Sequence, residues 1–514
     1  MLTHALETAF SRFVLFLAAI AVGLLAAISV AYGAEIDRRS AVLLLGVIGI
    51  IVLSIVSGRP RCVLLFGWVV ALTYGKAFFI TEGGEARGDF QGIYWILSDA
   101  FLIVLFAMWL FARSRDPNGI QMARWRFWPW LIPFAAAALI ATIGAIRTDW
   151  ALFELLRIFN VILVVFFLGS NLHFEEWWSC VAGLAFATLA QGGLSVLQVG
   201  LRRTSGGLLG FIGAGPGAAA AQQATDMEQA MGGFFRAYGT IGHPANLATY
   251  FLLTIPLLVG LSFVLKGKLR WVAVGCAAAG LAGLACTQSR GPWVFAAVQV
   301  VVVMIAMLLF RVLSVKHVIV LSGIATIVMF AVVVRYEEFI VERFSRDYSE
   351  SLELRSNDIN TAYQIFAESP LTGVGPNNYA AKLLDYAPEW KPLFDEAKEF
   401  QAEMNSRVFV APHNLFLFIL AEMGILGLLS FVILIIGMLW IGLRGLIRTS
   451  GAERVVIFGI IVGIFATMAQ SAINFSLWVD PVLFTFILQA GLLANAPIRQ
   501  PNVDLENAFL RKTE

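Results

Sequence analysis

Apolar runs, each close to the length of a membrane-spanning helix, recur along almost the whole chain and alternate with polar loops. A helix needs roughly 20 mostly apolar residues to cross the hydrocarbon core of a bilayer. By this criterion about fourteen runs are candidate spans, which predicts an all-α, polytopic helical membrane protein. The runs are residues 13–33, 41–57, 62–80, 93–112, 127–146, 151–169, 177–199, 243–265, 270–286, 292–310, 318–335, 413–443, 455–474 and 479–497.

Two of these runs differ from a simple span. The run 413–443 is longer than one crossing requires, which leaves room for a turn at the membrane surface. The run 151–169 contains Glu154 and Arg157, which are three residues apart and can pair on one helix. Such a pair is either functional or structural, and the sequence leaves both interpretations open. We expect about 12 to 14 transmembrane helices.

Two longer polar segments interrupt the apolar pattern. Segment 200–242 is rich in Gly and Ala, whereas segment 336–412 is rich in charged residues and Pro. Helical spacing of apolar residues predicts an amphipathic helix that ends before Ser369-Pro370, and Pro392 opens a second one. The two helices, joined by residues 373–376, would form an outward-facing helical cap. This divides the chain into an N-terminal transmembrane bundle (1–335), a periplasmic cap loop (336–412), C-terminal transmembrane helices (413–497) and a cytoplasmic tail (498–514).

Basic residues gather in alternate loops, which predicts that both termini are cytoplasmic and that segments 200–242, 287–291 and 336–412 face outward. Only 14% of the residues are charged and the mean hydropathy is +0.81. The net charge of +2 argues against a nucleic-acid binder. The run 13–33 exceeds the roughly 7–15 residues of a signal-peptide core, so we expect it to remain as the first span. The basic loops contain Arg12; Arg59 and Arg61; Arg113, Arg115, Arg124 and Arg126; Lys266, Lys268 and Arg270; Arg311 and Lys316; Arg444, Arg448 and Arg454; and Arg499, Arg511 and Lys512.

His413 is the best candidate for a catalytic base. It ends segment 336–412 and, with Asn414, opens the next apolar run at the membrane–water boundary. With a reference pKa of about 6.5, an imidazole there can accept a proton at neutral pH. The alternative is an interfacial His that caps the helix together with Asn414. His243 opens another span before Pro244 and is more typical of a structural helix start.

Three outward arginines could bind phosphate. Arg290 lies in a tight turn that opens a span, Arg236 precedes the segment 238–246, and Arg355 precedes the first cap helix. Guanidinium groups suit phosphate oxygens, although each residue alone could be a snorkelling or solvated charge. Glu35 and Asp37 are the nearest approach to a metal-binding pair, but two arginines follow them directly. We therefore expect neither a metal nor a cofactor.

Four short motifs occur in order between residues 236 and 430, and with them the chain resembles the O-antigen ligase/polymerase (Wzy-like) family of bacterial envelope glycosyltransferases. The first 200 residues match only in being hydrophobic. The motifs are Gly239-Thr-Ile-Gly-His-Pro-Ala-Asn246, Thr287-Gln-Ser-Arg-Gly291, Arg355 followed by Ser369-Pro-Leu-Thr-Gly-Val-Gly-Pro-Asn-Asn378, and Pro412-His-Asn-Leu415 leading into Glu422-Met-Gly-Ile-Leu-Gly427.

The resemblance implies a GT-C-like helical fold that uses undecaprenyl-diphosphate-linked glycans at the outer face of the bacterial inner membrane. By motif, the family's catalytic His falls on His413 and its phosphate-binding arginines fall on Arg290 and Arg355. Arg236 would be a third, and His243, Asn246 and Asn414 would support the site. The family also implies a flippase and a chain-length regulator as partners.

The resemblance leads us to expect a metal-independent, inverting glycosyl transfer in polysaccharide or lipopolysaccharide biosynthesis. We favour an exopolysaccharide or O-antigen polymerase, because the number of spans and the long cap depart from the compact ligase pattern. One alternative is an O-antigen ligase that attaches glycan to lipid A-core. The other is a lipid-linked oligosaccharide flippase, which should carry charges along a path inside the bundle and show repeat symmetry.

Overall fold

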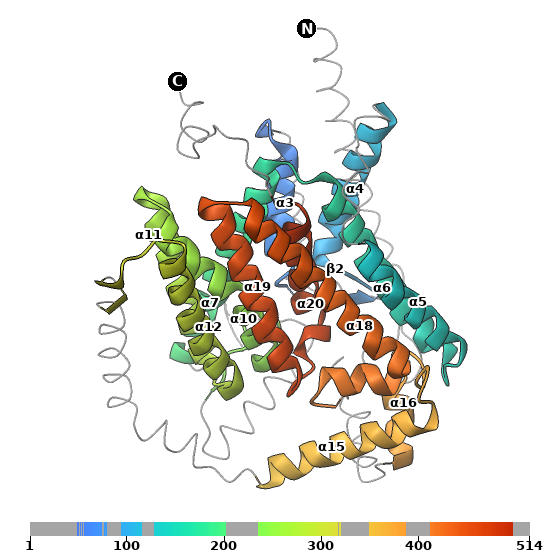
Figure 1. Ribbon diagram of the computed structural model, residues 1–514. Coiled ribbons are helices and arrows are strands. Elements are labelled where there is room, and N and C mark those ends of the chain that lie inside the picture. The colour runs from blue at the N-terminus through green and yellow to red at the C-terminus, as the bar shows by residue number, and fades with distance from the viewer. Residues whose placement is uncertain are drawn as a thin grey trace.

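The predicted polytopic all-α architecture is confirmed by a computed structural model (Figure 1). Seven described helices are long and apolar enough to cross a membrane, four shorter ones are also apolar, and each falls on a predicted run. The runs 13–33, 41–57 and 318–335 lie wholly or mostly outside the described residues. The structure describes residues 49–50, 52, 54, 56–74, 77–79, 94–115, 128–201, 235–316, 318–319, 349–386 and 412–496.

The helices keep the chain order of the predicted spans. The seven long ones are α6 (Thr148–Asn171), α7 (Phe174–Leu201), α10 (Pro244–Val264), α11 (Gly267–Cys286), α12 (Arg290–Leu309), α18 (Leu415–Arg448) and α19 (Gly451–Ser471). The four shorter ones are α3 (Pro60–Ala71), α4 (Leu97–Arg115), α5 (Trp128–Ile143) and α20 (Asp480–Ala494).

The run 62–80 does not form one continuous helix, as we had expected. Helix α3 ends at Ala71, and a short strand β1 (Ala77–Phe79) pairs antiparallel with β2 (Tyr94–Ile96). The carbonyl of Thr73 accepts a hydrogen bond from the Thr240 hydroxyl at 2.6 Å. A contact from a distant segment therefore occupies a carbonyl that a longer helix would use internally.

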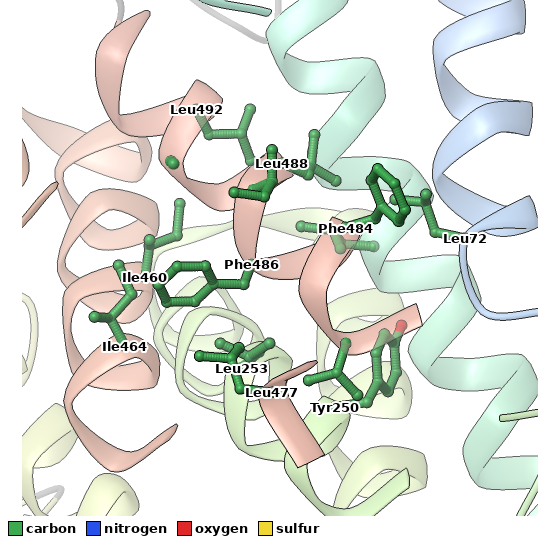
Figure 2. Close-up of a cluster of buried hydrophobic side chains, with 14 of the residues drawn as sticks. Leu72, Tyr250, Leu253, Ile460, Ile464, Leu477, Phe484, Phe486, Leu488 and Leu492 are labelled. Atoms are coloured by element: carbon green, nitrogen blue, oxygen red, sulfur yellow. The ribbon is translucent and has the colours of Figure 1, made fainter. Parts of the chain in front are cut away.

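Helix α10 forms the centre of the bundle and packs against α7, α11, α12, α19 and α20. Figure 2 shows the apolar core beside it, where Phe486 of α20 faces Ile460 and Ile464 of α19 above Leu253 of α10. Side chains larger than Gly would not fit on α19 at Gly459, where a Cβ would meet the backbone of Leu257. Small residues thus bring the two helix backbones close together, as is typical of packing within membranes.

A buried glutamine compensates for a proline inside α10, and a second one binds the next carbonyl. Pro256 has no backbone N–H, so the carbonyl of Leu252 lacks its usual partner within the helix. The Gln299 side chain of α12 donates to this carbonyl at 2.8 Å, and the Gln489 side chain of α20 donates to the carbonyl of Leu253 at 2.7 Å. Neighbouring helices therefore satisfy the backbone in a region without water.

The turns between the described helices lie at two opposite ends of the bundle (Figure 1). At one end, Arg59 and Arg61, at the start of α3, pair with Glu175 and Glu176 of α7. At the other end, the amphipathic helices α15 (Ser349–Glu368) and α16 (Tyr379–Tyr386) lie across the bundle, at the bottom of Figure 1. Helix α15 confirms the first predicted cap helix, whereas the helix expected from Pro392 lies outside the described residues.

The segment between α15 and α16 docks on a break in α18. Gly424 departs from helical geometry, with φ of 63° and ψ of −164°, so the run 413–443 contains a break. The amides of Val374 and Gly375 donate to the carbonyls of Ala421 and Glu422 at 3.1 and 2.9 Å. Two of the sequence motifs therefore bind each other, and together they fix the cap to the bundle.

Candidate functional site

The His413 side chain is free from any role in helix capping. Asn414 caps α18 instead, since its Oδ1 accepts the amides of Phe416 and Leu417 at 2.9 and 3.1 Å. The imidazole of His413 turns to the cap helix, where its Nδ1 lies 2.7 Å from Oδ2 of Asp358 on α15. The capping interpretation therefore applies to Asn414 alone.

The Asp358–His413 pair lies partly in the protein and partly in solvent. The Asp358 side chain is 13% exposed, whereas that of His413 is 49% exposed. The ring of Phe475, in the turn after α19, stands edge-on to the imidazole with the ring centroids 6.4 Å apart. A carboxylate on one side and an aromatic ring on another restrict the imidazole, while much of it stays accessible to a substrate.

His243 is the N-cap of α10, which confirms its prediction as a structural helix start. Its Nδ1 accepts the amide of Ala245 at 3.2 Å. The residue is exposed at the start of α10. Desolvation, followed by the neighbouring Arg236 and His413, lowers the pKa of His243 to about 4. His243 is therefore neutral at pH 7. It lies close enough to Arg236 and His413 for these residues to affect its pKa.

Arg236 joins the segment before α10 to the turn before α12. Its guanidinium donates from Nε to the carbonyl of Thr287 at 3.1 Å and from a terminal nitrogen to the Ser289 hydroxyl at 3.3 Å. Ser289 is the N-cap of α12, and Arg290 is the first residue of that helix, as the sequence predicted. Two arginines on different segments are thus brought to one turn at the start of α12.

The remaining predicted site residues lie on the same elements. Asn246 is half-buried in the first turn of α10, and Arg355 lies on α15 three residues before Asp358. Sequence reasoning missed Asp358, although its spacing from Arg355 on a predicted amphipathic helix was a usable signal. Glu35 and Asp37 lie outside the described residues.

The predicted pair Glu154–Arg157 is confirmed, and the structure adds a third member. Arg157 lies 2.8 Å from the Glu154 carboxylate and 2.8 Å from that of Asp480, which the sequence did not suggest. A terminal nitrogen of Arg157 also donates to the carbonyl of Trp478. Since this cluster is buried and ties α6 to α20, we interpret it as structural.

Residues 274–432 match the family model described as O-antigen ligase. This part of the chain is similar to the O-antigen ligase family. The match confirms the resemblance stated from the sequence, and it includes Arg290, Asp358 and His413. The comparison with curated proteins found no match. Together with the membrane helices, the match supports a multi-pass membrane enzyme that processes glycans, of the ligase/polymerase type of glycosyltransferase.

Proposed function

We propose that the enzyme is an exopolysaccharide or O-antigen polymerase of the bacterial inner membrane, with its active site on the periplasmic side. It would transfer a growing glycan from undecaprenyl diphosphate to a hydroxyl of another lipid-linked repeat. The observation that carries this proposal is the imidazole of His413, partly exposed at the capped end of the bundle and 2.7 Å from Asp358. The gathering of Arg236 and Arg290 at the same end supports it.

The proposed reaction is an inverting displacement with His413 as the general base. The acceptor hydroxyl oxygen forms a bond to the anomeric carbon, while the bond from that carbon to the diphosphate oxygen breaks. The hydroxyl proton passes to His413, and the bonding electrons leave with undecaprenyl diphosphate. A positioned base contributes roughly 10²- to 10⁴-fold in rate.

The arginines would hold the diphosphate through the reaction. Arg290, Arg236 and, from the cap helix, Arg355 offer guanidinium groups that match phosphate oxygens. Positive charge placed where negative charge develops lowers the barrier to departure of the leaving group. Asn246 and the neutral His243, at the start of α10, would support the acceptor or donor by hydrogen bonds.

The second candidate function is O-antigen ligation to lipid A-core, which the description of the matching family favours. The polymerase remains our choice because the predicted number of spans and the long cap depart from the compact ligase pattern. A flippase is disfavoured, since the candidate residues that the structure describes gather at one end of the bundle. A flippase and a chain-length regulator are the partners we expect for the polymerase.

Glycan analysis in the native host tests this function. The gene is deleted and complemented with the wild type, His413→Ala or the control His173→Ala, an exposed His at the opposite end of the bundle. Single repeats on the surface in place of long polymer indicate a polymerase. Polymer that stays on undecaprenyl diphosphate, with a bare core, indicates a ligase. Rescue by His413→Ala at normal protein level contradicts the role of His413.

A further inference from the structure

We propose that Asp358 is a positioning residue for His413, so that the cap helix α15 contributes half of a catalytic pair. This inference rests on the proposed function, in which His413 is the base. It assigns a role to a residue that the sequence did not single out. It also makes the cap part of the catalytic machinery, in addition to a cover over the site.

The geometry of the pair is that of a charge-assisted hydrogen bond. The distance of 2.7 Å between Oδ2 of Asp358 and Nδ1 of His413 is at the short end of the range for such bonds. A carboxylate only accepts, so Nδ1 carries the hydrogen and Nε2 is the ring atom that can take a proton. Asp358 therefore selects the tautomer that a general base needs.

Asp358 is the carboxylate that contacts the imidazole of His413. Among the described elements, α15 brings Asp358 to the imidazole, and the segment before α10 brings Arg236 and the neutral His243 near it. The Tyr379 hydroxyl is buried, and burial with the charges of Asp358 and Glu422 raises its pKa. Tyr379 therefore stays neutral and cannot replace the carboxylate.

In the proposed step, Asp358 stabilises the imidazolium without taking a proton itself. When Nε2 receives the acceptor proton, the ring becomes positive, and the negative carboxylate on Nδ1 compensates that charge. The Nδ1 hydrogen stays where it is. The same arrangement of acid, imidazole and nucleophile recurs on unrelated folds, because it depends on geometry and not on chain order.

The position of Asp358 depends on the docking of the whole cap helix. Ala362 and Ile365 on α15 are buried, and α15 contacts α18, which begins directly after His413. The pair spans 55 residues of sequence, so only this docking brings the two side chains together. A shift of α15 away from α18 would separate the base from its partner.

Steady-state kinetics of the purified full-length enzyme in detergent, with a lipid-linked oligosaccharide donor, test this role. We expect Asp358→Asn to lower kcat by roughly 10²- to 10⁴-fold with little change in KM. Asp358→Glu should recover part of the rate. The control is Asp385→Asn, since Asp385 is an exposed carboxylate on α16 that pairs with Lys382, and it should retain wild-type activity.

Two further measurements separate positioning from a structural role. Asp358→Asn should move the acid limb of the kcat profile to lower pH, because the imidazolium loses its counter-charge. In the His413→Ala background, Asp358→Asn should cause no additional loss, since it acts through His413. An additional loss there, a change in KM alone, or a rate within about threefold of wild type overturns the inference. In contrast, an active His413→Ala enzyme overturns the proposed function itself.

Discussion

Gln198 of α7 hydrogen-bonds both backbone groups of Gly239: its Oε1 lies 3.0 Å from the amide nitrogen and its Nε2 lies 3.3 Å from the carbonyl oxygen. The same Oε1 accepts the amide of Tyr238 at 3.2 Å. Two turns earlier on α7, Gln191 binds the amide and the hydroxyl of Thr240. A transmembrane helix thus fixes the path of the segment between Arg236 and His243.

We expect Gln198→Leu to destabilise the protein and to lower glycan transfer. The substitution leaves the buried amides of Tyr238 and Gly239 without their acceptor, at about 1–3 kcal/mol for each group. Thermal unfolding in detergent and transfer activity measure the two effects. Leu197→Ala is the control, because Leu197 is 54% exposed on the outer side of the same helix. Equal melting temperatures for both variants would contradict the interpretation.

Gly373→Ala and Gly424→Ala should each prevent the cap from docking. Both glycines have positive φ, 68° and 63°, and a Cβ would overlap the backbone of Glu422 in one case and of Leu371 in the other. The overlap alone costs about 1–3 kcal/mol, and the left-handed backbone adds to it. Protease sensitivity and thermal unfolding report the loss. Gly193→Ala, where a Cβ meets open space, should be neutral or stabilising.

Arg157→Ala should destabilise far more than Arg147→Ala. Removal of Arg157 leaves the buried carboxylates of Glu154 and Asp480 without their cation, which costs about 3–5 kcal/mol. Arg147 pairs with Asp149 in an exposed position, and such pairs contribute about 0–1 kcal/mol. The fraction of folded protein recovered in detergent and its melting temperature compare the two variants. A similar loss for both would show that the buried cluster is not structural.

His243 should make stability depend on pH below about 6.5. Its pKa in the folded protein, about 4, lies below the value of about 6.5 for the unfolded chain. As the pH falls from 6.5 towards 4, the unfolded state therefore binds a proton that the folded state refuses, and stability is lost. His243→Asn keeps a capping side chain but does not titrate. Melting temperatures between pH 7.5 and 5 should fall less for this variant than for the wild type.

Local sequence features predicted the elements of the fold well. Apolar run length located the helices, and the spacing of apolar residues located α15 before Ser369. Asn414 and the His243-Pro244 pair marked the starts of α18 and α10, because capping depends on atoms within a few residues. The prediction of one continuous helix over the run 62–80 was wrong for a physical reason. Thr240, far along the chain, donates a hydrogen bond to the carbonyl of Thr73, just after the end of α3.

The sequence by itself determined that the chain crosses a membrane many times and which His and Arg residues are candidates for chemistry. It also predicted that successive loops lie on alternate sides of the membrane. These properties follow from run length, charge placement and caps, which act locally between the chain and its solvent. Only the tertiary structure decided the partners: Asp358 for His413, and Asp480 for Arg157. Such pairs depend on how helices that are distant in sequence rotate about their axes and slide along one another. Packing over the whole length of these helices fixes both, so local sequence features do not predict the pairs.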